Sequence, residues 1–177
     1  KTARTIFEGY SALDILRMKQ VVFVHSCLAA GAPVHILEEI LSDIERSGLL
    51  AEAGGVFVLN YGLQVPQRVL EAFPAVHFVQ VSGDIARFEI PTLQTLHYFC
   101  RLSWALRTQA GLSADPQAAD AGDYQVLYVH TKGGSVQEEV SQIRDWRHLM
   151  TYFLVNNHRK CARLLRDGEG DVLGVNL

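Results

Sequence analysis

The segment His130-Thr131-Lys132-Gly133-Gly134-Ser135 combines residue types that bind phosphate groups. Glycine lets backbone N–H groups approach an anion closely, a helix N-terminus carries partial positive charge, and Lys132 adds a full charge. Together these features predict a phosphate or diphosphate site where a strand turns into a helix. The Walker A pattern G-x-x-x-x-G-K-[ST] is absent, and an ordinary strand-to-helix turn containing glycine is the alternative interpretation.

Three further charged residues are candidates for the same site. Arg147 lies on the helix that follows, where it could turn back toward the anion or pair at the surface with Asp145 or Glu139. The surface pair is the simpler of these two readings. Asp84 and Glu89 are the carboxylates expected near the strand ends, and either could act as a general base or bind a sugar hydroxyl. Glu89 could instead stabilise the dipole of the helix that it precedes.

Polar residues stand at the end of each apolar run that could form a strand. They are His25 and Ser26, Asn60 and Tyr61, Ser82 and Asp84, then His130, Thr131 and Lys132, and finally Asn176. Ligands of open parallel sheets bind at the carboxyl ends of the strands, so we expect these side chains to line one crevice. Loops are commonly polar, which is the simpler explanation of the same pattern.

Strands and helices alternate along the chain. The predicted strands are Val21–His25, Gly55–Asn60, Val76–Ser82, Tyr124–Thr131 and Asp171–Asn176. The predicted helices run from Pro33 to Gly48, near Gln67–Phe73, from Pro91 to about Gln109, and from Ser135 to about Arg166. This alternation predicts an α/β fold with a mostly parallel, twisted sheet of about five strands and helices on both faces.

Helical spacing also predicts which faces of the two longest helices are buried. In the helix after Pro91 the inner stripe is predicted to be Leu93, Leu96, His97, Cys100 and Trp104. In the last helix it is predicted to be Val136, Val140, Ile143, Trp146, Met150, Phe153, Asn157, Cys161 and Leu164. These positions recur every three or four residues, as the buried face of an amphipathic helix does.

Length and composition exclude several classes of protein. The 177 residues fit a single domain, 1–177, and the net charge of −3 argues against nucleic acid as a partner. The longest apolar runs, such as Val126–Val129, are far shorter than a membrane-spanning helix. The 7 histidines and 3 cysteines show no metal-ligand spacing. Because the chain begins with Lys1, we expect it to be part of a longer product.

Three separated segments resemble one family. They are Leu127–Gly133 (LYVHTKG), Asp145-Trp146-Arg147 and Val172–Asn176 (VLGVN), and parts of 83–93 are similar as well. The chain resembles glycosyltransferase-like proteins with a GT-A type nucleotide-sugar fold, and the bacterial rhamnan-synthesis family carries a similar H-T-K followed by W-R. The resemblance implies a Rossmann-like, GT-A-like domain that transfers a sugar from a nucleotide-diphosphate sugar to a carbohydrate or glycoconjugate acceptor.

The resemblance also implies roles for the residues named above. The residues that would hold the nucleotide are His25, Ser26 and Asn60. The diphosphate would lie near Thr131, and its developing charge would be stabilised by His130, Lys132 and Arg147. Asp84 or Glu89 would contact the sugar or accept a proton.

The sequence departs from that family in two ways. The D-x-D motif that holds a divalent metal in many such enzymes is absent. Three interpretations of this absence are open. His130 and Lys132 could replace the charge of the metal, or a divalent metal could bind without the motif. Alternatively, the chain does not catalyse and is an α/β scaffold or interaction module derived from such an enzyme. A Gly-Asn-Trp-Trp type segment, expected soon after Asn176, does not follow, so we expect a domain truncated at its C-terminus.

Overall fold

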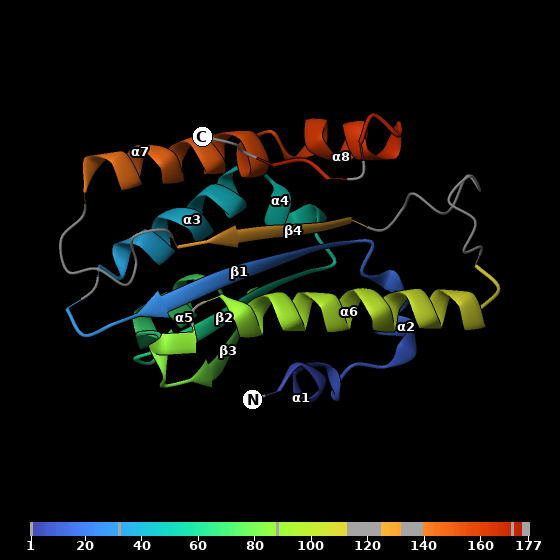
Figure 1. Ribbon diagram of the computed structural model, residues 1–177, viewed down its shortest axis with the longest axis horizontal. Helices are drawn as coiled ribbons and strands as arrows, with labels where there is room; N and C mark the ends of the chain where they lie inside the picture. Colours follow the sequence, from blue (N-terminus) through green and yellow to red (C-terminus); the bar gives the residue numbers. More distant parts are fainter. Residues whose placement is uncertain are drawn as a thin grey trace.

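The computed structural model describes residues 2–31, 33–87, 89–112, 125–131, 140–170 and 172–174. Its strands are β1 (Gln20–Leu28), β2 (Gly55–Gly62), β3 (His77–Ser82) and β4 (Gln125–His130). They form one four-stranded sheet in the order β3-β2-β1-β4 (Figure 1), and all neighbouring pairs are parallel. The predicted α/β class is therefore confirmed, and it matches a Rossmann-like arrangement. Of the predicted fifth strand, Asp171–Asn176, the described residues 172–174 form no strand, and the others lie outside the described residues.

Helices cover both faces of the sheet (Figure 1). One face carries α3 (His35–Arg46), α4 (Leu49–Glu52), α5 (Gln67–Ala72), α7 (Ser141–Met150), the π-helical η3 (Thr151–Asn156) and α8 (His158–Arg166). The other face carries α1 (Ala3–Phe7), α2 (Ala12–Arg17) and α6 (Ile90–Gln109), with the short 3₁₀ turn η1 (Ile85–Arg87) before α6. None of the described helices is long and apolar enough to cross a membrane.

The direction of strand addition reverses beside β1. From β1 the chain passes over one face to β2 and then to β3, after which α6 returns along the opposite face to β4 on the other side of β1. A right-handed crossover places its helix on one face when strands are added in one direction and on the opposite face when they are added in the other direction. The change of face at α6 is therefore the one that right-handed connections favour. Open α/β sheets bind their ligands at the carboxyl ends of the two strands on either side of such a reversal, which here are β1 and β4.

Two hydrophobic clusters hold the layers together. The amphipathic pattern predicted between Pro33 and Gly48 is confirmed, because the apolar positions of α3 are all buried: Ile36, Leu37, Ile40, Leu41 and Ile44. Gly48 ends that region with a φ of 82°, a left-handed conformation that favours glycine. On the opposite face the core is aromatic, with Phe7, Phe23, Phe57 and Phe99 in mutual ring contact.

The predicted buried face of α6 is wrong. Leu93 is 44% exposed and Trp104 is 61% exposed. The buried residues are instead Thr92, Thr95, Phe99 and Ser103. Small hydroxyl residues let the helix approach the sheet closely, and Thr95 satisfies its hydroxyl by donating to the Pro91 carbonyl at 2.8 Å. A pattern that counts only large apolar side chains cannot detect such a face.

The predicted helix up to about Arg166 is helical over most of its described part, but it is not one regular α-helix. After α7 the backbone adopts the wider π-helical winding of η3, which rotates the following residues relative to an α-helix. The buried positions there are Thr151, Val155 and His158. Of the predicted buried face, Met150 is buried, whereas Phe153 is 48% exposed.

The two aromatic residues of α6 allow a direct test of which face is buried. We expect Phe99→Ala to lower the free energy of unfolding by about 3–5 kcal/mol, because it removes a fully buried ring from the aromatic core. Trp104→Ala, on the exposed face of the same helix, should change it by less than about 0.5 kcal/mol. Denaturant unfolding of both variants measures the difference, and a larger loss in Trp104→Ala would contradict the observed packing.

Candidate functional site

The predicted site residues lie at the carboxyl edge of the sheet, but on two opposite faces. Successive side chains of a strand point to alternate faces, so His25 and Ser26 of β1 are separated by the sheet. The α6-face cluster contains His25, Tyr61, Thr92, Tyr128, His130 and Glu89. The α3-face cluster contains Ser26, Asn60, Gln80 and Thr131. A single crevice lined by all of these side chains is therefore not what the structure forms.

His25 is the buried centre of the α6-face cluster. Its Nδ1 lies 2.9 Å from the Thr92 hydroxyl, which donates to the Tyr61 hydroxyl at 3.4 Å. A hydroxyl group can donate or accept, so Thr92 can bond to either ring tautomer of His25. Burial lowers the pKa of His25 to about 4, although the nearby Glu89 carboxylate acts in the opposite direction. His25 is therefore a neutral imidazole at pH 7.

His130 is the register partner of His25 on the neighbouring strand. Its Nδ1 lies 3.4 Å from Oε1 of Glu89, the residue immediately before α6. The Glu89 carboxyl group is 43% exposed, so the pair can exchange a proton with solvent or with a ligand. A carboxylate beside an imidazole is a suitable arrangement for general acid–base chemistry.

Two aromatic residues complete this part of the edge. The Tyr128 ring is stacked with His130, with centroids 6.0 Å apart and planes 5° apart. Trp146 of α7 meets His130 edge-on at 6.1 Å. The Tyr128 hydroxyl is buried and makes no hydrogen bond to any described residue. Burial and the Glu89 carboxylate raise its pKa, so it keeps its hydrogen and can act as a donor.

The α3-face cluster is satisfied within the protein. Asn60 Oδ1 accepts from the Ser26 hydroxyl at 2.9 Å, and Asn60 Nδ2 donates to Gln80 Oε1 and to the Leu63 carbonyl, both at 2.7 Å. Ser26 and Asn60 are completely buried. The structure thus uses these two side chains to fix the segment after β2. The Thr131 hydroxyl accepts from the Cys27 backbone N–H at 3.4 Å, which is likewise an internal contact.

Arg147 is a buried residue of α7 that pairs with α3 in the described structure. It is 1% exposed and donates to Glu39 of α3 at 3.0 Å. The expected surface partner Asp145 lies instead 3.9 Å from Arg144, and Glu139 lies outside the described residues. Breaking a buried ion pair leaves an uncompensated charge, so this bond is a structural link between α7 and α3.

Asp84, another predicted site residue, caps a short turn instead of joining the α6-face cluster. The Asp84 carboxylate accepts from the Ala86 N–H at 2.9 Å and caps η1, where it is exposed. Lys132, with the predicted diphosphate loop through Ser135, lies outside the described residues, as does Asn176. Within the described ranges, histidine, cysteine and carboxylate side chains form no group of three or more that could hold a metal ion.

Sequence reasoning missed three members of this edge as site residues: Thr92, Tyr128 and Trp146. The signal for Tyr128 was available, because a residue two positions before His130 on a strand shares its face. The same rule would have separated Ser26 and Asn60 from His25. Thr92 and Trp146 come from helices, and only the packing of those helices places them here.

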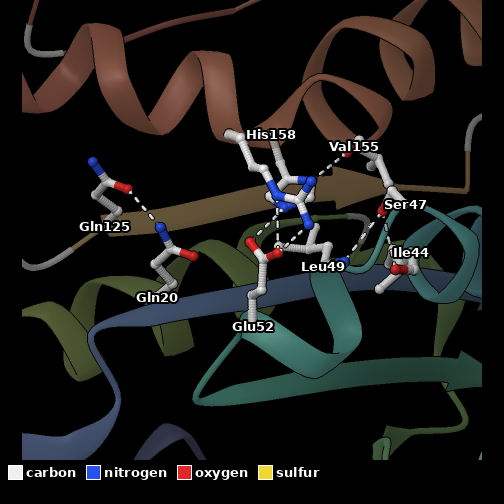
Figure 2. Close-up of polar contacts among 9 residues, drawn as sticks. Gln20, Ile44, Ser47, Leu49, Glu52, Gln125, Val155 and His158 are labelled. Atoms are coloured by element: carbon white, nitrogen blue, oxygen red, sulfur yellow. Dashed lines mark hydrogen bonds and ion pairs between the residues drawn. The ribbon is translucent and has the colours of Figure 1, made fainter.

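The amino edge of the sheet holds a second polar cluster of different character. Figure 2 shows the Glu52 carboxylate extending from α4 toward His158 of α8, whose Nε2 lies 3.0 Å from Glu52 Oε2. His158 Nδ1 lies 2.9 Å from the Val155 carbonyl, and Arg159 Nε donates to Glu52 Oε1 at 2.9 Å. Arg159 and His158 lower the pKa of Glu52 to about 2. These groups pair with one another and anchor α8 to α4, which is a structural role.

The neutrality of His25 makes stability depend on pH. Between pH 6.5, its ordinary pKa, and about pH 4, the unfolded chain binds a proton that the folded chain does not. The free energy of unfolding should therefore fall as the pH falls through this range, by about 3 kcal/mol from His25. His25→Gln, whose amide can bond to Thr92 but does not titrate, should lose less stability between neutral pH and pH 4 in denaturant unfolding. An equal loss of unfolding free energy in the unmodified protein and in His25→Gln would contradict a lowered pKa for His25.

Comparison of the chain with protein-family models, with curated proteins and with solved structures finds no match. The chemistry of the carboxyl edge is therefore interpreted from its own geometry. That geometry is a Rossmann-like sheet whose strand order reverses beside β1, with a neutral histidine, a histidine–carboxylate pair and aromatic rings at the reversal.

Proposed function

We propose that this chain binds a nucleotide-diphosphate sugar at the carboxyl ends of β1 and β4 and transfers the sugar to a carbohydrate or glycoconjugate acceptor, as a GT-A-like variant of the Rossmann-like class. The observation that carries the proposal is the position of the α6-face cluster. His25 and His130 are register partners on the two strands where the strand order reverses, which is where open α/β sheets bind nucleotide-type ligands.

In this proposal the Glu89–His130 pair is the proton acceptor. The acceptor hydroxyl forms a bond to the anomeric carbon of the sugar while the bond from that carbon to the diphosphate oxygen breaks. The hydroxyl proton passes to the Glu89–His130 pair, and the negative charge leaves on the diphosphate. His25, held neutral by burial, is the register partner of His130 on the neighbouring strand.

The charge on the departing diphosphate requires a positive partner. The sequence contains no D-x-D motif, and we assign this role to Lys132, two residues after the end of β4 in the sequence. A positioned cation stabilises charge that develops in the transition state. Arg147 is not assigned here, because its guanidinium is engaged with Glu39.

A second candidate function is a non-catalytic α/β module that docks to another protein. The observation in its favour is the apolar surface that two helical segments expose. Ile90, Leu93 and Trp104 are exposed on α6, and Leu149, Tyr152 and Phe153 are exposed on α7 and η3. Exposed apolar patches mark interaction sites, although single exposed apolar residues are common on soluble proteins.

Thermal unfolding in the presence of nucleotides distinguishes the two candidates. UDP, GDP, TDP and their sugars would be tested with and without manganese. At 100 times its dissociation constant the correct ligand should stabilise the fold by about 2.7 kcal/mol. Lys132→Ala should abolish this shift, whereas Lys160→Ala, an exposed lysine on α8, should retain it.

Stabilisation by one diphosphate that depends on Lys132 supports the transferase proposal, and its dependence on manganese would show whether a metal takes part. A well-folded chain that responds to none of these ligands would contradict the proposal and favour the docking module.

A further inference from the structure

We infer that the edge formed by Glu89, Tyr128, His130 and Trp146 binds the ring of a neutral sugar and rejects sugar acids. The inference deepens the proposed function. It rests on that function for the claim that the sugar is attached to a nucleotide. It assigns ligand-binding roles to Tyr128 and Trp146, for which the sequence alone predicted no role at the site.

The rings form a corner in which an apolar surface can lie. Tyr128 and His130 are two residues apart on β4, so both point to the α6 face, and their planes differ by only 5°. Trp146 stands at 82° to the His130 ring. β4 is at the edge of the described sheet, and Trp146 is only partly buried beside it. The C–H face of a sugar ring is apolar, and aromatic rings with a polar end suit such a mixed ligand.

The polar atoms beside the corner match hydroxyl groups. The Glu89 carboxylate is an acceptor only, it is partly open to solvent, and it lies 3.4 Å from His130. The buried Tyr128 hydroxyl lies near the Glu89 carboxylate, which helps to raise the pKa of Tyr128. A sugar hydroxyl can donate to the exposed part of the Glu89 carboxylate.

The charge of Glu89 determines which sugars fit. A sugar acid would bring a second carboxylate close to Glu89, and like charges at short distance repel. Free phosphate would meet the same repulsion at this position. A neutral pyranose carries only donors and acceptors and avoids this cost, so the site should discriminate by charge.

Fluorescence of Trp146 is the direct readout. The chain has 2 tryptophans, so Trp104→Phe leaves Trp146 as the single emitter. This protein would be titrated with methyl glucoside and with free glucuronate, and separately with UDP-, GDP- and TDP-sugars against the matching diphosphates. The free glycoside tests an acceptor sugar, and the nucleotide-linked series tests the donor sugar. We expect a change in emission with neutral sugars in at least one series and none with glucuronate.

Two variants in this background assign the effect to the carboxylate. Glu89→Gln should weaken neutral-sugar binding about tenfold, since a hydrogen bond to a charged acceptor is lost, and it should reduce the discrimination against glucuronate. Glu71→Gln, which removes an exposed carboxylate on α5, should change neither property.

The possible failures are distinguishable. Diphosphates that stabilise the chain while neutral sugars leave Trp146 unchanged would overturn the sugar site and leave the proposed function standing. A response of Trp146 to methyl glucoside without any stabilisation by diphosphates would support the sugar site and overturn the nucleotide part of the proposed function. Binding of glucuronate as tight as that of methyl glucoside would overturn the charge discrimination.

Discussion

The parallel pairing of β1 with both β2 and β4 is the constraint on which the rest of the structure depends. It fixes the register that sets Ser26 beside Asn60 and His25 beside His130. A shift of one residue along β1 would move His25 from the α6 face to the α3 face. The separate hydrogen-bond networks of the two faces, one around Thr92 and the other around Asn60, each require the observed register.

The two ends of the sheet differ in how their polar groups are satisfied. At the amino edge Glu52 and His158 bond to each other, to Arg159 and to backbone atoms, so their hydrogen-bonding groups are used internally. At the carboxyl edge the Glu89 carboxylate beside His130 is 43% exposed, so part of it is open to a ligand. This partly exposed histidine–carboxylate pair is the feature that favours a ligand at the carboxyl edge.

Much of the fold could be predicted from local patterns. The apolar runs and the amphipathic helix α3 have the periods of strand and helix, so the four described strands and the α/β class follow from spacing. The buried face of α6 could not be predicted, because Thr92, Thr95 and Ser103 become core residues only through contact with the sheet. The π-helical winding of η3 also depends on packing and carries no residue signature that we recognise.

The candidate site could be predicted only in outline. Polar residues at strand ends indicated the correct edge and included His25, Glu89 and His130. The pairing of Arg147 with Glu39 joins residues 108 positions apart, so the sequence spacing of either residue gives no hint of it. Asn60 has the residue type of a ligand-binding side chain, but three internal hydrogen bonds to Ser26, Leu63 and Gln80 occupy its amide.

Backbone amide hydrogen exchange with and without nucleotide-diphosphate sugars tests most directly whether the carboxyl edge is the ligand site. If it is, UDP-, GDP- or TDP-sugars should slow exchange at the end of β1 from His25, in the first turn of α6 and at the end of β4 through Thr131. Exchange around Gln20, Glu52 and Gln125 at the amino edge should stay unchanged. Protection confined to the amino edge, or no protection with any of these ligands, would contradict a ligand site between β1 and β4.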